Sequence, residues 1–306
     1  MTTPVKKFFT IFKIAGRQWW AKDPFRESAV IAYYAIFSLP GLLAVVITIA
    51  GYFFGQEAVN GQLMNQITGV MGTDTAKDVQ EIVAKATQSR NSVWAAIIGI
   101  TTILVGATGV FVEFQKSLNT IWGVKTDESK SGIISLLKAR LFSFGLIIAI
   151  AFIMIVSLVI SAALSALSTW ISQRFSELLL VVLQVLNFIL SLGVLAVLFA
   201  LMFKFFPDAK IKWRHVWVGS FVTALLFDIG KFILGLYFGK AEPGSGYGAA
   251  GSIILILLWT SYSSMIVFFG AEFTHIYAES TDGKVPPDKH GVKIPKVNSP
   301  FPHQHT

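Results

Sequence analysis

Two ionisable residues lie inside a long apolar stretch of this sequence. Asp228 and Lys231 are three positions apart in the run 216–238, so in a helix they share one face. Charged groups inside a membrane segment are costly, and they usually face a partner or a water-filled cavity. The pattern therefore has two interpretations: a charged site on a substrate or proton path, and an intrahelical ion pair that neutralises itself.

Three further carboxylates border apolar runs, all on the side of the membrane that the distribution of Lys and Arg predicts to be cytoplasmic. They are Glu27, Glu113 and Glu272. Together they could line a vestibule that continues the candidate path. They could equally form ion pairs with basic residues nearby, and the sequence leaves both alternatives open. The basic candidates are Arg26, Lys116 and Arg140.

A proline interrupts the first apolar run. Pro40 lies near the middle of residues 28–54, within the letters "SLPG". Because proline has no backbone N–H, a helix here would leave the carbonyl of Ile36 without its partner. Broken helices at the membrane midplane are frequent at transporter binding sites. We therefore include Pro40 in the candidate path.

The letters "GSGYGAAGS" contain a spacing that is typical of dinucleotide-binding loops. Gly246, Gly248 and Gly251 form G-x-G-x-x-G. Such a loop must follow a strand in a βαβ unit, whereas this one lies between two apolar runs of membrane length. The pattern therefore predicts a tight connection between two spanning helices, where glycine permits positive φ and close backbone approach.

Composition explains which elements hold these residues. The chain of 306 residues is 54% hydrophobic and only 14% charged, which is typical of a polytopic membrane protein rather than a soluble domain. Six runs are long enough to span a bilayer, which takes roughly 20 residues. They cover residues 28–54, 93–112, 141–164, 178–203, 216–238 and 250–273. We expect an all-α fold with six transmembrane helices.

The distribution of Lys and Arg predicts the orientation. Six of these residues lie in residues 1–27, five in the second connection, four in the fourth and four after the last run. The first, third and fifth connections hold five in total. By the positive-inside rule both termini are cytoplasmic. This asymmetry also accounts for the net charge of +8, so a nucleic-acid partner is not required.

Three segments flank or interrupt the predicted membrane domain of residues 28–278. Residues 1–27 carry an apolar stripe at helical spacing beside basic residues, which predicts a cytoplasmic interfacial helix. The outer connection, residues 55–92, is expected to form two short helices split near "GTDT", capping the bundle through Val79 and Val83. Residues 279–306 are rich in Pro and Lys, which predicts a disordered cytoplasmic tail.

Several classes of protein are excluded or disfavoured. The absence of cysteine excludes disulfides, thiolate metal sites and a cysteine nucleophile. No metal-ligand motif, cofactor motif or acid–base constellation in a soluble domain occurs. We expect no enzymatic activity, no metal and no cofactor.

Four stretches resemble the YihY/BrkB family of bacterial inner-membrane proteins. They are "ESAVIAYYAIFSLPGLLAVVITIAGYFFG", "GATGVFVEFQKSLNTIWGV", "FKFFPDAKIKWRHVWVGSFVTALLFDIGKFILGLYFG" and "GSGYGAAGSIILILLWTSYSSMIVFFGAEFTHIYA". The resemblance covers most of residues 10–280. Two positions depart from the family pattern: Thr108 stands where serine is common, and Pro40 is one place early.

The resemblance implies a function in the cell envelope. An old ribonuclease label of the family is regarded as a misassignment. Members are associated with serum resistance and with movement of envelope lipids or lipopolysaccharide precursors. We therefore expect a transporter or flippase-like conduit for such lipids, without an ATPase of its own, with membrane lipids and an envelope lipid-transport protein as partners. The alternatives are a small-solute or ion transporter using Asp228 and Lys231, and a membrane enzyme as the least favoured.

Overall fold

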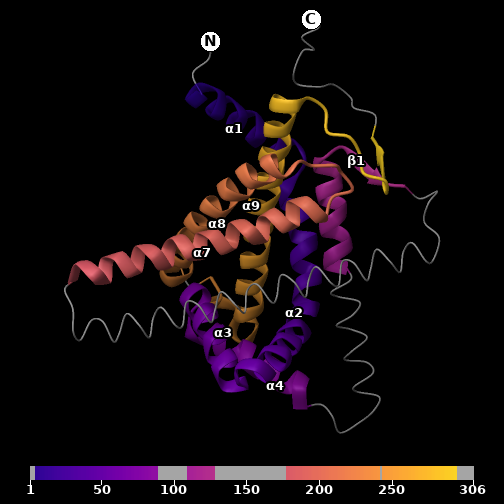
Figure 1. Ribbon diagram of the computed structural model, residues 1–306. Helices are drawn as coiled ribbons and strands as arrows, with labels where there is room; N and C mark the ends of the chain where they lie inside the picture. The colour runs from indigo at the N-terminus through magenta and orange to yellow at the C-terminus, as the bar shows by residue number, and fades with distance from the viewer. Residues whose placement is uncertain (1–3, 89–108, 128–176, 242, 295–306) are drawn as a thin grey trace, which may run out of the picture.

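The computed structural model describes residues 4–88, 109–127, 177–241 and 243–294. Within these ranges the chain is mostly helical, in agreement with the helical part of the predicted fold class (Figure 1). In chain order the elements are α1 (Pro4–Ala21), α2 (Pro24–Phe54), α3 (Gln56–Met71), α4 (Thr73–Gln88), a helix over residues 109–121, β1 (Val124–Thr126), α7 (Glu177–Phe205), α8 (Trp213–Ala241), the 3-10 helix η2 (Ser245–Ala250), α9 (Gly251–Asp282) and β2 (Gly291–Lys293).

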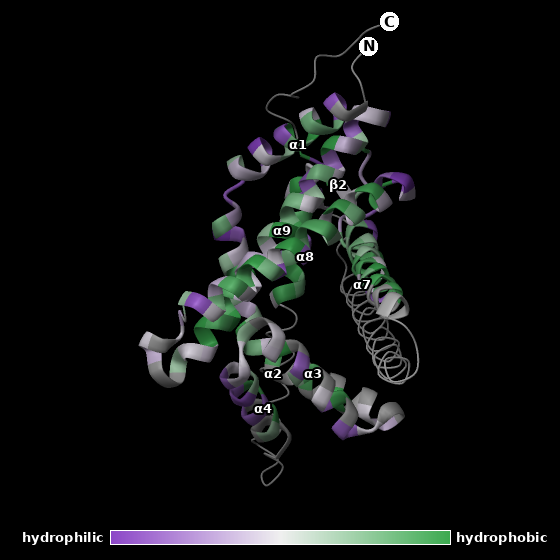
Figure 2. Ribbon diagram, turned by 90° about the vertical axis from the view of Figure 1, so that its left-hand side faces the viewer, coloured by the Kyte–Doolittle hydropathy of each residue, from purple (hydrophilic) through white to green (hydrophobic). Residues whose placement is uncertain are grey.

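Three helices of the described ranges are long and apolar enough to cross a membrane. They are Val185–Phe205, Trp213–Ala241 and Gly251–Asp282. They coincide with the last three predicted runs, and α2 covers the first run as one helix. The run 141–164 and most of the run 93–112 lie outside the described residues, so the count of six stays a prediction. Figure 2 shows α7, α8 and α9 hydrophobic over most of their length.

The helix α9 holds the bundle together, because it contacts α1, α2, α4 and α8. Its crossing with α8 is built from two reciprocal pairs. A Cβ on Gly219 would overlap the Thr274 side chain, and a Cβ on Gly270 would overlap the Thr223 side chain. Each threonine hydroxyl donates to the carbonyl four residues earlier, at 2.7 Å. Small residues thus let two apolar helices approach closely, while the hydroxyls stay satisfied.

Residues 55–92 contain the two short helices that the sequence predicts, and their outer location stays a prediction. The break between α3 and α4 falls at Gly72, whose φ of +89° lies in the left-handed region that favours glycine. Val79 and Val83 of α4 are buried beside Ile256 of α9. The pair therefore covers the end of α9 that lies opposite α1 (Figure 1).

The N-terminal helix ends before Pro24, as the sequence predicts. Asp23, with φ of +54°, forms the corner, and Pro24 begins α2. One face of α1 is used inside the protein, since Ile11 and Ala15 are buried against Phe273 and Ile276 of α9. Phe9 and Trp20 stay exposed. One part of the apolar face that was expected to contact lipid therefore packs against α9, and another part stays exposed.

The C-terminal segment differs from the expected disordered tail. The helix α9 continues to Asp282, and β2 pairs antiparallel with β1, with Val124 opposite Lys293. The amide of Lys210 donates to the Pro286 carbonyl at 2.9 Å. Proline-rich composition misled the prediction, because this strand depends on partners far away in sequence. Residues 295–306 lie outside the described ranges.

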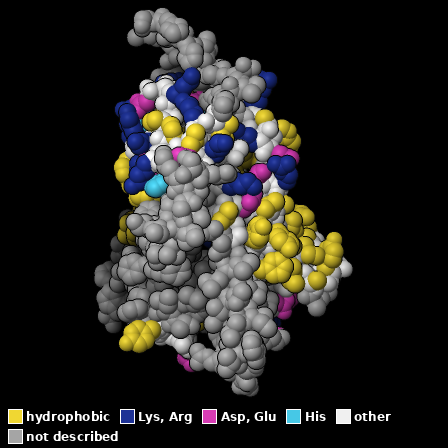
Figure 3. Space-filling view, turned by 90° about the vertical axis from the view of Figure 1, so that its right-hand side faces the viewer, with side chains coloured by type: hydrophobic (Ala, Val, Ile, Leu, Met, Phe, Trp, Pro, Cys, Tyr) yellow, Lys and Arg dark blue, Asp and Glu magenta, His cyan; other side chains and the backbone are white. Residues whose placement is uncertain are grey.

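The basic side chains of the described ranges gather at one end of the molecule. Figure 3 shows Lys and Arg concentrated at the end where α1 and the C-terminal segment lie, with a group of hydrophobic side chains directly below them. This segregation agrees with the charge asymmetry of the sequence, and the cytoplasmic orientation stays a prediction.

Candidate functional site

Asp228 and Lys231 lie in the middle of α8, and both side chains are half-buried. The ion pairs found among the described residues include neither of them. The self-neutralising pair is therefore not formed in this structure. The polar path through these residues stays a prediction.

The two charges lie along the border between two faces of α8. On the inner face Gly230 contacts α9, where a Cβ would come within 2.7 Å of the Tyr262 hydroxyl. Phe227 packs edge-on against Trp259, with 6.0 Å between the ring centroids. On the outer face Ile229 and Phe232 are 49% and 67% exposed. A polar strip therefore runs beside an exposed apolar surface.

Glu27 and Glu113 take the basic partners that the sequence suggested. A carboxylate oxygen of Glu27 is 3.1 Å from Arg26, and the other accepts a hydrogen bond from Ser117 at 2.8 Å. Glu113 is 3.4 Å from the Lys116 ammonium, one turn away. The bond to Ser117 ties α2 to the helix 109–121. Both carboxylates are thus engaged in the described structure.

Glu272 has a partner that the sequence did not suggest. Its side chain is fully buried, and its Oε2 is 2.6 Å from the Nζ of Lys22. Lys22 also donates to the Ile121 carbonyl at 3.3 Å. This lysine stands at the corner before Pro24, and that corner directs it inward. The pair therefore joins α9, the α1–α2 corner and the end of the helix 109–121.

Two more titratable side chains continue from Glu272 along α9. His275 is buried, with its Nδ1 3.8 Å from Glu272 and its Nε2 3.3 Å from Glu279. The Trp122 ring covers the imidazole, with 5.1 Å between centroids. Spacings of three and four residues place these groups on one face. The spacing of Glu272, His275 and Glu279 in the sequence carries this signal, which the sequence analysis did not use.

The remaining predicted site residues are placed as follows. The helix α2 passes through Pro40 without a break in its helical assignment. In the glycine-rich connection, the backbones of Gly244 and Gly251 approach so closely that a Cβ on Gly251 would lie 2.6 Å from the Gly244 carbonyl oxygen. Gly246 has open space around it. Gly246 and Gly248 belong to η2, between two helices, so the dinucleotide interpretation is rejected on context.

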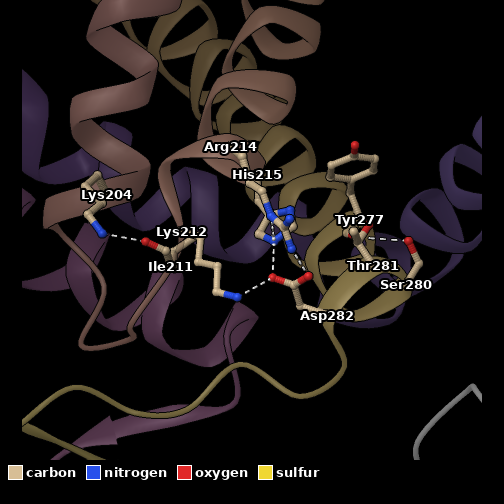
Figure 4. A network of polar contacts seen from close by, with 9 residues as sticks. All are labelled: Lys204, Ile211, Lys212, Arg214, His215, Tyr277, Ser280, Thr281 and Asp282. Carbon is tan, nitrogen blue, oxygen red and sulfur yellow. Dashed lines mark hydrogen bonds and ion pairs between the residues drawn. The ribbon is translucent and has the colours of Figure 1, made fainter.

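A cluster at the end of α9 was missed by the sequence analysis. Asp282 accepts from Lys212 at 2.8 Å, contacts Arg214, and lies 2.9 Å from the His215 imidazole (Figure 4). Gly283, with φ of +78°, ends the helix just beyond it. Lys212 directly precedes α8, and Arg214 and His215 lie in its first turn, so the cluster connects the start of one helix to the last turn of another. Only tertiary packing reveals such a pairing.

A second missed cluster surrounds Asp208. Its carboxylate accepts hydrogen bonds from Asn119 at 2.8 Å and from Thr126 at 2.9 Å. Its own amide donates to Asn119 at 2.7 Å, and its carbonyl accepts from the Asp288 amide at 2.9 Å. These bonds fasten the α7–α8 connection to the helix 109–121, to β1 and to the C-terminal segment.

The described residues present polar groups suited to binding and ion pairing. No group of three or more His, Asp or Glu in the described ranges is arranged to hold a metal ion. The chemistry available here is charge recognition at Asp228 and Lys231, and a buried series of carboxylates and imidazole along the inner part of α9.

Comparison with known proteins gives one family. The family model described as virulence factor BrkB matches residues 15–294. A "UPF0761 membrane protein" of Saccharophagus degradans is 26% identical over 257 residues, which make up 83% of this chain and 56% of that protein. One of Alteromonas mediterranea is 27% identical over 267 residues, 83% of each chain. No solved structure gives a significant match.

Proposed function

Because this chain belongs to the family described as virulence factor BrkB and is a multi-pass bacterial membrane protein, we propose that it is a transport protein, a flippase-like conduit for envelope lipids or lipid-linked precursors. The observation that carries this proposal is the position of Asp228 and Lys231. Both are half-buried at the border between the packed face and the exposed face of α8.

A protein that moves a lipid across a membrane needs a polar surface next to an apolar one. Its polar headgroup must pass the apolar midplane, whereas its acyl chains can stay in the bilayer. Asp228 and Lys231 supply opposite charges for a headgroup, and Ile229 and Phe232 supply the adjoining exposed apolar surface. A charge held in a membrane helix costs at least about 2.5 kcal/mol on insertion scales. A role in transport gives a reason for keeping this cost.

The second candidate is transport of a small solute or ion, with protons as the coupling ion. The series Glu272, His275 and Glu279 favours it, because these buried titratable groups follow one another at 3.8 and 3.3 Å along α9. The sequence contains no G-x-x-x-x-G-K-[ST] motif. We expect the chain to have no hydrolytic activity, and transport would depend on a gradient or on an envelope lipid-transport partner.

Reconstitution into liposomes distinguishes the two candidates. Full-length protein is placed in vesicles with a fluorescent headgroup-labelled lipid, and a membrane-impermeant quencher reports which leaflet the label occupies. The lipid conduit predicts that label in the inner leaflet becomes accessible in protein-containing vesicles and stays protected in protein-free ones. The opposite result is transport of protons or solute across the vesicle membrane while the label in the inner leaflet stays protected. That result would overturn the lipid proposal and support the second candidate.

A further inference from the structure

The cluster around Asp282 holds more positive than negative charge. One carboxylate faces the ammonium of Lys212 and the guanidinium of Arg214, with the buried His215 imidazole beside them (Figure 4). The side chains of Lys212 and Arg214 are nevertheless 67% and 58% exposed. Each therefore keeps N–H donors directed away from Asp282, and these donors can bind a second anion.

Exposed aromatic rings adjoin these cations, because Trp213 stands between Lys212 and Arg214 in the chain. Trp213 stands between Phe205 and Trp217, with ring centroids 5.9 and 6.4 Å apart. The three residues are 39%, 43% and 47% exposed in the order Phe205, Trp213 and Trp217. The Lys204 ammonium lies 5.6 Å from the Trp213 ring. Tryptophans that combine an apolar body with a polar edge favour the membrane–water interface.

The cations and the rings occupy the starting end of a helix that can cross a membrane, since the span begins at Trp213. We propose that this surface, the Trp213 patch of Phe205, Lys212, Trp213, Arg214 and Trp217, binds an anionic phospholipid. The headgroup phosphate is bound by Lys212 and Arg214. The aromatic rings contact the glycerol and the first part of the acyl chains.

Two features select a lipid over a free phosphate. Three exposed rings give the patch an apolar area that an inorganic anion cannot cover. The position at the end of a candidate span places the cations at headgroup level, where each Lys or Arg adds to the binding of anionic lipid. The site also lies 14 residues from Asp228, about 21 Å along the helix axis. It is therefore separate from the proposed transport path and does not depend on it.

Titration calorimetry of the full-length protein in a neutral detergent tests this site. The probe is dioctanoyl phosphatidylglycerol, compared with dioctanoyl phosphatidylcholine and with glycerol phosphate. We expect the anionic lipid to bind more tightly than either comparison ligand. The variant Lys212→Gln/Arg214→Gln should lower its affinity about 25-fold, from roughly fivefold per cation. The matched control Lys77→Gln/Lys240→Gln removes two exposed cations elsewhere and should leave the affinity unchanged.

A second variant tests the site through a gain of affinity, which misfolding would not produce. Asp282→Asn removes the competing negative charge, so the affinity for the anionic lipid should rise about fivefold. A purely structural role of Asp282 predicts no increase. The proposal is overturned if Asp282→Asn fails to strengthen binding, if the control pair weakens it as much as Lys212→Gln/Arg214→Gln, or if glycerol phosphate binds as tightly as the lipid.

Discussion

The Lys22 ammonium lies 2.6 Å from the Glu272 carboxylate, and this ion pair joins the corner between α1 and α2 to the buried face of α9. The Glu272 side chain is fully buried, whereas that of Lys22 is 30% exposed. A carboxylate taken out of water is stabilised only while its partner and hydrogen bonds remain. The contact therefore keeps three helices in register at this end of the molecule.

Breaking this pair on one side should destabilise the fold more than removing it entirely. Lys22→Met leaves a buried carboxylate without its cation, and we expect a loss of about 3 kcal/mol in the free energy of unfolding. The double variant Lys22→Met/Glu272→Leu should recover most of this loss. Chemical unfolding in detergent micelles measures both, with Lys13→Met on the exposed face of α1 as the matched control. A double variant with a lower free energy of unfolding than Lys22→Met would contradict this expectation.

The crossing of α8 and α9 depends on Gly219 facing Thr274. Gly219→Ala places a Cβ into the Thr274 side chain, so we expect destabilisation of about 1–3 kcal/mol. Gly235→Ala in the same helix is the matched control, because open space surrounds that position and alanine has the higher helix propensity. Thermal unfolding measures the stability of both variants, and only Gly219→Ala should unfold at a lower temperature than the wild-type chain. Adding Thr274→Gly to Gly219→Ala should restore part of the loss, and equal behaviour of the two alanine variants would refute the tight crossing.

The C-terminal segment should depend on Asn119. Asn119→Ala removes the two hydrogen bonds exchanged with Asp208, at a cost of about 2–4 kcal/mol because one acceptor is a carboxylate. Hydrogen exchange should then accelerate in residues 286–293, which Asp208 and its neighbours hold in place. Asn65→Ala, at an exposed position of α3, provides the comparison. Unchanged exchange in the segment would mean that Asp208 does not hold it.

The predicted topology can be tested in a chain that has no cysteine of its own. Gly61→Cys lies in α3 at a position with open space around it, and it should react with an impermeant thiol reagent added outside the cell. Ser131→Cys, in the second connection, should react only after the membrane is permeabilised. The opposite labelling pattern at either site would reverse the orientation or change the number of spans.

Local signals in the sequence predicted the elements well. The corner before Pro24, the break between α3 and α4 at Gly72, and the apolar lengths of α8 and α9 each follow from neighbouring residues. The missed features are contacts between distant positions. Lys22 meets Glu272 across 250 residues, and β2 pairs with β1 through backbone groups that carry no periodic signal. Such partners become visible only when the packing of the helices is known.

The central claim is that Asp228 and Lys231 carry a lipid headgroup past the apolar midplane. The most direct measurement compares lipid translocation in liposomes for the wild-type chain and for the double variant Asp228→Leu/Lys231→Leu, with thermal unfolding of both in detergent. Since neither residue pairs with the other or with another described residue, the double variant should keep its fold. The account predicts a stably folded protein that no longer translocates lipid. Full translocation by the folded double variant would contradict it and reduce the two residues to a structural part of α8.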